Sequence, residues 1–278
     1  RQPPRGTYHR AMSTTLQHRP PGNGVLRALA GWAMLSWRVL HISAVIGVLA
    51  LSPSSYARAN RPAIAANIVV DTLPMLGWFT LLTSLISLVL IRIVYVTALG
   101  YGLSRYALEM VVHVLVLELI PLTAALFVAV RCAIPNGAEV TALRRSGAFD
   151  ALRRSGADPL VREVLPRGMA GVLGVMLLAG LSCVVSLLLA YLVAYGFTPW
   201  AFAGYTRTVG HVFDPALTLV FAVKTLLFAL AVSVIPVASA LVDAPPSRSR
   251  TSVEVRSLVR MFALLLLIEA ASLAVSYI

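Results

Sequence analysis

Long apolar runs separated by polar connections dominate this chain. Five of them reach the length of about 20 residues that a helix needs to cross a hydrocarbon core of roughly 30 Å. They are expected at Pro74–Thr97, Ala107–Val130, Gly168–Tyr195, Ala216–Val242 and Leu258–Ile278. Strands of a membrane β-barrel would instead alternate apolar and polar residues in short segments. The pattern therefore predicts an all-α integral membrane protein with five transmembrane helices.

Two regions of different character precede the first span. Residues 1–23 are polar and rich in Arg, Pro and Gly, a composition typical of a disordered basic N-terminus. Residues 24–73 combine an apolar stretch, Gly24–Leu51, with a polar elbow. Because Arg27 and Arg38 fall on one narrow arc of a helical wheel, we expect this stretch to form an amphipathic helix in the membrane interface. Residues 74–278 then form the expected five-span domain.

One long polar island lies between the second and third spans. Arg131–Arg167 carries seven arginines and four acidic residues, and the motif ALRRSGA occurs in it twice with an offset of nine residues. A continuous helix would place the two copies on opposite faces, so we expect a break between them. Gly147 and Gly156, which each follow an Arg-Arg pair, are predicted to end short helices.

Two aspartates are expected to cap the next helices of this island. Asp150 is predicted to cap the second short helix, and Asp158 a third one with Pro159 in its first position. A plain solvated loop, whose arginines only set the membrane topology, is the alternative interpretation.

Composition and charge narrow the class of protein. The chain has 278 residues, of which 59% are hydrophobic and 12% charged, with a mean hydropathy of +0.85. These values exclude a soluble domain of this size. A net charge of +12 would suggest nucleic acid as the partner of a soluble protein. Here the arginine-rich connections alternate with arginine-poor ones, which predicts a cytoplasmic N-terminus and island and a periplasmic C-terminus, and no nucleic-acid partner.

Several ionisable residues fall inside the apolar runs, where they usually face a cavity or a partner helix. Glu118 precedes Pro121 by three residues, and the proline leaves a carbonyl free one turn upstream, so we expect a polar and irregular segment there. Lys224 is a candidate counter-ion for a buried acid such as Glu118 or Glu269. The spacing does not decide which acid it pairs with.

No enzymatic constellation is present in the sequence. It contains no HExxH, no GxSxG and no phosphate-binding glycine loop with its lysine. Glu109 and His113 stand one helical turn apart, but two ligands are too few for a metal site. Cys132 and Cys183 are scattered, which favours neither a disulfide framework nor a metal centre. We expect no catalytic residues, no metal and no cofactor in this chain, so any ATP must bind a partner.

The residues around the island resemble a known family. The segment LELIPLTA followed by AVR, at 117–124 and 129–131, is similar to RELGPVLTA…AGR of the MlaE/YrbE-type permeases, the membrane subunits of MCE-linked ABC lipid transporters. Glu139 stands at the acid of that family's AAELG, and FDAL at 149–152 resembles the end of TEQIDAL. DP at 158–159 and VLPR at 164–167 resemble DP…VVPR without a gap. The chain departs from the pattern at Leu117, Ala133 and Pro135 and at 244–248.

The resemblance implies an ABC-type phospholipid permease of the bacterial inner membrane that works as a dimer. The expected partners are a second copy of the chain, an ATPase that binds ATP and Mg, a periplasmic MCE-domain protein and a small STAS-type cytoplasmic subunit. The implied lipid-binding cavity residues are Leu90, Val94, Tyr101, Glu118 and Leu119. The implied ATPase-coupling residues are Arg131, Glu139, Arg144, Arg145, Asp150, Arg153, Asp158, Pro159 and Arg167.

Two other functions remain open from the residues alone. One is a stand-alone secondary transporter that uses Glu118, Lys224 or Glu269 for protons, although the repeated halves typical of such proteins are not evident. The other is a non-transporting membrane scaffold whose basic island binds anionic lipid.

Overall fold

The computed structural model describes residues 61–156, 158–242 and 250–276, together with parts of the stretch from 34 to 48. Every element assigned in these ranges is a helix. Five of the helices are long and apolar enough to cross a membrane, which confirms the predicted architecture. They run over Thr72–Gly100, Tyr106–Arg145, Leu160–Tyr195, Pro215–Val242 and Glu254–Val275.

The expected interfacial helix at Gly24–Leu51 lies largely outside the described residues, and residues 1–23 lie wholly outside them. Residues 41–46 are helical, and Val39 and Ile46 are buried against the main apolar cluster of the bundle. The described residues from Arg38 onward belong to one compact unit.

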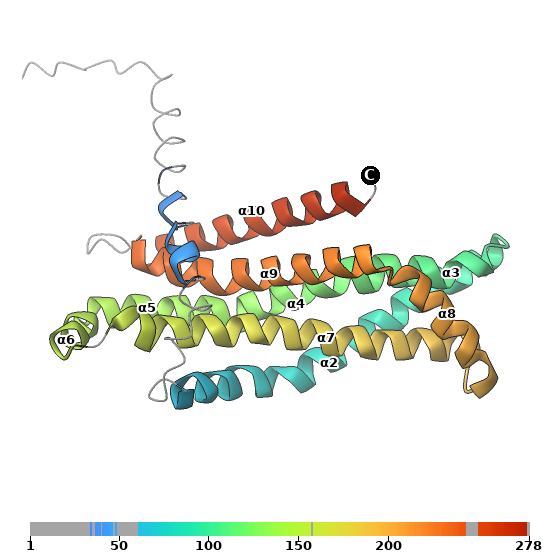
Figure 1. Cartoon of the computed structure of the whole chain (residues 1–278), viewed down its shortest axis with the longest axis horizontal. Helices are drawn as coiled ribbons and strands as arrows, with labels where there is room; N and C mark the ends of the chain where they lie inside the picture. The colour runs from blue at the N-terminus through green and yellow to red at the C-terminus, as the bar shows by residue number, and fades with distance from the viewer. Residues whose placement is uncertain are drawn as a thin grey trace, which may run out of the picture. The chain divides into compact units, whose positions relative to one another are not determined.

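Helix α9 (Pro215–Val242) is the most enclosed span of this unit. Every residue from 231 to 240 is buried. It packs against α10 (Arg250–Ser276), α7 (Leu165–Tyr195), α5 (Ile134–Arg145) and α4 (Ile120–Val128). Figure 1 shows it lying between α10 and the layer formed by α4, α5 and α7. An all-round apolar helix is expected to occupy such a central position.

Small residues allow α9 to approach its neighbours closely. A Cβ atom on Gly171 of α7 would lie 2.5 Å from Ser233 Oγ and 2.9 Å from Ser233 Cβ. A Cβ atom on Gly137 of α5 would lie 3.1 Å from the carbonyl oxygen of Pro236. Small residues at helix contacts are the usual means of tight packing in membranes.

The second span contains two π-helical segments and the third span begins with one, and each of these is followed by a proline. Segments η2 (Val112–Leu119), η3 (Ala129–Ala133) and η4 (Leu160–Val164) precede Pro121, Pro135 and Pro166, in each case by two residues. Proline has no N–H to donate to the carbonyl four residues before it. In the residues that precede each proline, the backbone hydrogen bonds therefore span five residues instead of four. The irregular segment predicted around Glu118 is confirmed and follows from Pro121. Pro74 and Pro236 lie inside α-helices without such a segment.

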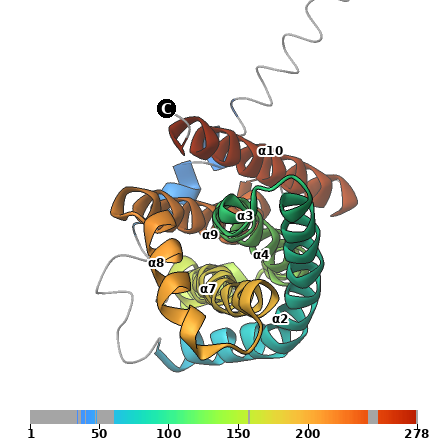
Figure 2. The same ribbon diagram turned by 90° about the vertical axis from the view of Figure 1, so that its right-hand side faces the viewer.

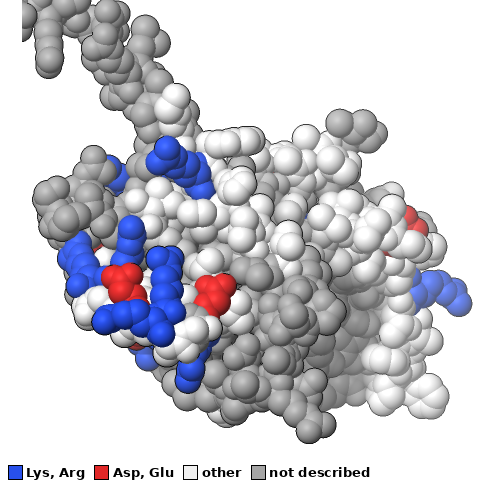
Figure 3. Space-filling view, turned by 60° about the vertical axis from the view of Figure 1, so that its left-hand side comes forward, with Lys and Arg blue, Asp and Glu red and all other residues white. Residues whose placement is uncertain are grey.

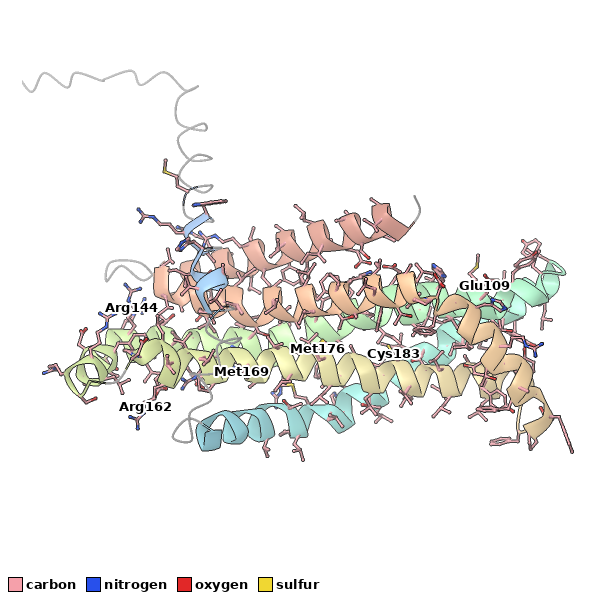
Figure 4. The ribbon with its side chains drawn as sticks, viewed as in Figure 1. Glu109, Arg144, Arg162, Met169, Met176 and Cys183 are labelled. Atoms are coloured by element: carbon pink, nitrogen blue, oxygen red, sulfur yellow. The ribbon has the colours of Figure 1, made fainter. Side chains whose placement is uncertain are left out.

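The two ends of the bundle differ. One end carries α5, the short helix α6 (Ala148–Arg154) and η4; the other carries α3 (Ser104–Val111), η5 (Pro199–Ala201) and α8 (Phe202–Val212). Figure 4 places Arg144 and Arg162 at the first end and Glu109 at the second, with Met169, Met176 and Cys183 along α7 between them. Viewed from the second end, α2 (Arg61–Gly100) flanks α7 and α4 (Figure 2). Charge from the polar island therefore gathers at one end.

The contact between α7 and α9 provides a test of the packing. Gly171→Ala forces a methyl group against both side-chain atoms of Ser233, so we expect it to lower the free energy of unfolding by about 1–3 kcal/mol. The matched control is Gly180→Ala on the same helix, where a Cβ atom meets nothing within 4 Å. That change should be neutral or should stabilise the helix by up to about 1 kcal/mol. Reversible unfolding in mixed micelles measures both, and equal effects would contradict the packing.

Candidate functional site

Three ionisable side chains from three different spans meet inside the bundle. Lys224 Nζ on α9 lies 2.9 Å from Glu269 Oε2 on α10 and donates a hydrogen bond to Glu118 Oε2 on η2. The Lys224 side chain is only 2% exposed, and those of Glu118 and Glu269 are 16% and 17% exposed. We call these three residues the ion cluster. Lys224 therefore pairs with both candidate acids at once.

The electrostatics of the ion cluster explain why the three groups are held together. A lone charge in this environment would carry a large desolvation cost, which a close counter-ion offsets only with good geometry. The Lys224 ammonium also lies 5.8 Å from the centre of the Phe228 ring, a favourable cation–π distance. If both acids were ionised, the cluster would carry a net charge of −1. The cluster thus combines one cation with an excess of acceptor oxygens.

Two apolar grooves run along the spans, and one of them reaches the ion cluster. The α9–α10 groove has a volume of about 410 Å³, and Lys224 is the one charged residue among its lining residues, which otherwise include Val223, Leu227 and Leu267. The α2–α4 groove has a volume of about 370 Å³ and is lined by Leu119, the neighbour of Glu118, among others. The apolar lining of these grooves suits hydrocarbon chains. Ligand sites in proteins usually combine such a lining with a few polar groups, and the ion cluster supplies these groups in the α9–α10 groove.

The five residues expected in a lipid cavity lie in different surroundings. Leu119 lines the α2–α4 groove. Leu90, Val94 and Leu119 are half-buried and pack against the same apolar cluster. Glu118 belongs to the ion cluster, whereas Tyr101 is 79% exposed in the turn after α2. Lys224 and Glu269 were recognised from the sequence as charges within apolar runs, but their spacing could not place them in the site.

The polar island forms the basic end of the bundle, defined here as residues 131–167. Its first part continues the second span as helix α5, and its last part continues into α7. Gly147 and Gly156 have φ values of +74° and +80°, so the predicted breaks at these glycines are confirmed. Figure 3 shows arginine side chains gathered there around a few acidic ones.

Arg144 connects the basic end to the central helix. Its Nη1 donates to the carbonyl oxygen of Leu241 and lies 3.4 Å from that of Ala240, near the end of α9. The last carbonyls of a helix have no partners within the helix, and a cation there also favours the helix dipole. Together with the close contact of Gly137 and Pro236, this bond joins α5 to the end of α9.

The other coupling candidates also lie at the basic end. Arg167 donates to Glu163 Oε2 at 2.7 Å and lies 3.4 Å from Glu139 Oε2. Asp158 Oδ1 accepts the N–H of Leu160 at 2.9 Å, which confirms its predicted capping role. Pro159 is buried beside it. The exposed candidates are Arg131, Arg145, Asp150 and Arg153.

The predicted cap at Asp150 is wrong. Helix α6 begins at Ala148 with Gly147 as its N-cap and no side-chain cap, and the Asp150 amide bonds to the Gly147 carbonyl at 3.1 Å. The positive φ of Gly147 starts the helix directly, which puts Asp150 three positions into it. An acidic residue in the first turn still stabilises the helix, because its negative charge interacts favourably with the positive end of the helix dipole.

Metal chemistry finds no support in the described ranges, where no group of three or more His, Cys, Asp or Glu side chains is placed to hold an ion. Cys132 and Cys183 are buried free thiols. The fold and the site together define a polytopic helical membrane protein with an ion cluster among its spans and a basic end.

Comparison with known proteins identifies the family. The model of the family described as Permease MlaE matches residues 64–275, and the chain belongs to this family of permeases. A probable ABC transporter permease protein of Rickettsia felis (strain ATCC VR-1525 / URRWXCal2) is 25% identical over 180 residues, covering 63% of this chain and 70% of the relative. The chain is thus a permease subunit of the ABC transporter type, which implies a separate ATPase partner.

Removing Lys224 from the ion cluster should change the stability of the protein. Lys224→Met leaves two acids without their shared cation, so we expect it to lower the free energy of unfolding by about 3–5 kcal/mol. The matched control is the triple variant Lys224→Met, Glu118→Gln, Glu269→Gln, which removes all three charges and should recover most of this loss. Unfolding in mixed micelles measures both variants, and wild-type stability of Lys224→Met alone would refute the pairing.

Proposed function

We propose that this permease subunit moves phospholipid between the inner membrane and a periplasmic MCE-domain partner. The observation that carries the proposal is the ion cluster beside the apolar α9–α10 groove, whose lining includes Lys224. A phospholipid needs apolar walls for its acyl chains and polar partners for its headgroup. Lys224 offers a cation to a phosphate, and Glu118 and Glu269 offer acceptors to a headgroup amine or hydroxyl.

Helix α9 is suited to carry motion from the ATPase to this site. Its end is held by Arg144 and by the Gly137 contact at the basic end, and Lys224 lies nearer its start. A packed helix moves as a unit, so a displacement of α5 shifts α9 along its length. The resulting change in the α9–α10 groove would expel acyl chains and separate Lys224 from one of its acids.

The assembly around this chain follows from the family resemblance. We propose a dimer of permeases in the bacterial inner membrane with the basic end cytoplasmic and docked on the ATPase, which binds ATP and Mg. The C-terminus then faces the periplasm, where the MCE-domain partner receives or delivers lipid. Arginines concentrated at one end of the bundle support this orientation under the positive-inside rule. A small STAS-type subunit is a further candidate partner.

The direct test uses the chain reconstituted with its ATPase and MCE partners in proteoliposomes that contain labelled phospholipid. Transfer of the label to the MCE protein should depend on ATP. The triple variant that removes the ion cluster is expected to fold but to lose most of this transfer, because the headgroup has no polar partners along the path. Transfer by the triple variant at the wild-type rate would contradict the proposal.

The ion cluster also supports a second candidate function, a secondary transporter driven by protons. Two acids that share one lysine within the spans are the kind of group that proton-driven transporters use as a proton relay. The discriminating experiment places the chain alone in liposomes with a pH gradient and no ATP. Solute or lipid movement under these conditions would favour the second candidate, whereas movement only with ATP and the ATPase favours the first.

A substitution at Arg144 tests whether the basic end is coupled to transport through α9. Arg144→Glu replaces the donor to Leu241 by an acid facing carbonyl oxygens, and a hydrogen bond with a charged partner is worth about 1.5–3 kcal/mol. We expect lipid transfer per ATP hydrolysed to fall by roughly tenfold. The control is Arg207→Glu, an equal charge change at an exposed position on α8 at the opposite end of the bundle, which should keep wild-type coupling. If both variants keep wild-type coupling, the role of Arg144 is refuted.

A further inference from the structure

Two aromatic side chains at the end opposite α6 stand out by their exposure. Phe197 and Trp200 are 92% and 93% exposed, the highest values for large hydrophobic side chains among the described residues. They lie in the connection between α7 and α8, which has no part in the ion cluster or the basic end. We call residues 196–201 the aromatic turn.

The aromatic turn is rigidly supported. Gly196, with a φ of +64°, ends α7. Tyr191 Oη donates to the carbonyl oxygen of Thr198 at 2.5 Å, and the Thr198 hydroxyl donates to the carbonyl oxygen of Tyr195. The protein thus displays Phe197 and Trp200 on a fixed support.

A stack of rings reinforces this support from α8. The Tyr205 ring lies with its centre 5.2 Å from that of Tyr191 and 6.2 Å from that of Tyr195, both edge-on. Tyr205 Oη donates to the carbonyl oxygen of Leu187 at 2.6 Å. Burial, followed by the proximity of Tyr195, raises the pKa of Tyr205 to about 12, so this hydroxyl remains a donor throughout the physiological range.

The length of α7 places the turn at a defined depth. From Arg167, paired with acids at the basic end, to Tyr195 the helix advances 28 residues, which is about 42 Å at 1.5 Å per residue. A bilayer with its headgroup layers is about 40–45 Å thick. With Arg167 in one headgroup layer, Tyr195 and the following turn reach the opposite one.

Helix α8 has the character of an interfacial helix. Figure 1 and Figure 2 show it crossing the end of the bundle between the end of α7 and the start of α9. It buries Tyr205 and Val212 and exposes Phe202, Arg207 and His211. Aromatic rings at headgroup level, next to a basic side chain, are the pattern that membranes favour at their interfaces.

We infer that the aromatic turn anchors this end of the bundle in the lipid surface, with Trp200 and Phe197 inserted at the boundary between headgroups and acyl chains. The partner is therefore the bilayer leaflet opposite the basic end. The anchor holds the ends of α7 and α8 at constant depth. This inference does not depend on which substrate the permease carries.

The test measures the depth of Trp200 by fluorescence. The chain contains four tryptophans, so Trp32→Phe, Trp37→Phe and Trp78→Phe leave Trp200 as the single emitter. The variant is reconstituted in vesicles whose phospholipids are brominated either near the headgroup or near the end of the acyl chain. We expect the shallow bromines to quench Trp200 more strongly than the deep ones, with little quenching by iodide in the water.

The depth control uses the same helix. Leu177→Trp, combined with Phe at all four native tryptophan positions, puts a single emitter at an exposed site near the middle of α7. Its quenching should show the reverse order, with the deep bromines stronger. Strong quenching of Trp200 by iodide alone would overturn the anchor and leave the turn in water.

A second comparison separates lipid from protein as the occupant. The Trp200 variant is purified with its native partner subunits into discs made of the shallow brominated lipid. Quenching equal to that of the permease alone supports contact with lipid. Loss of quenching in the complex would show that a partner protein covers the turn, and would overturn the inference.

Discussion

The contact on which this structure depends is that of one lysine with two carboxylates in the middle of a membrane bundle. Lys224 is buried on α9, and its ammonium is satisfied only because η2 and α10 bring Glu118 and Glu269 to it. A buried ion pair of this kind contributes little net stability, but removing one partner is costly. The cluster therefore constrains how three spans can be arranged more than it stabilises them, which makes it sensitive to any shift of α9.

The packing of α9 connects it to the basic end, so a movement there can shift α9. Helix α9 is enclosed by four other helices and contacts α5 and α7 through glycines that permit close backbone approach. Its end is joined to the basic end by Arg144, so that a surface rich in arginine is mechanically linked to a charge in the interior. The π segments ahead of Pro121, Pro135 and Pro166 depart from the regular hydrogen-bond pattern of the second and third spans, and one of them contains Glu118.

Local features were predictable from the sequence, and long-range ones were not. Apolar length predicted the five spans, Gly147 and Gly156 predicted the breaks, and Pro121 predicted the irregular helix around Glu118. Lys224 and Glu118 are 106 positions apart, and their pairing depends on how whole helices rotate and shift against one another, which spacing does not reveal. The same is true of the bond from Arg144 to Leu241. The prediction that Asp150 caps α6 was wrong for a local reason: Gly147, with its positive φ, starts the helix without a side-chain cap. The cavity residues taken from the family resemblance remain a prediction.

The central claim is that force applied at the basic end reaches the ion cluster through α9. It is tested most directly by the distance across the α9–α10 groove, measured by electron paramagnetic resonance between spin labels at Val223→Cys and Ala271→Cys in the assembled transporter. Both positions line the groove, and the native Cys132 and Cys183, which are buried, are first replaced by Ala. The account predicts that trapping the ATPase with bound ATP changes this distance, and that Arg144→Glu abolishes the change. A distance that stays the same in both nucleotide states would contradict it.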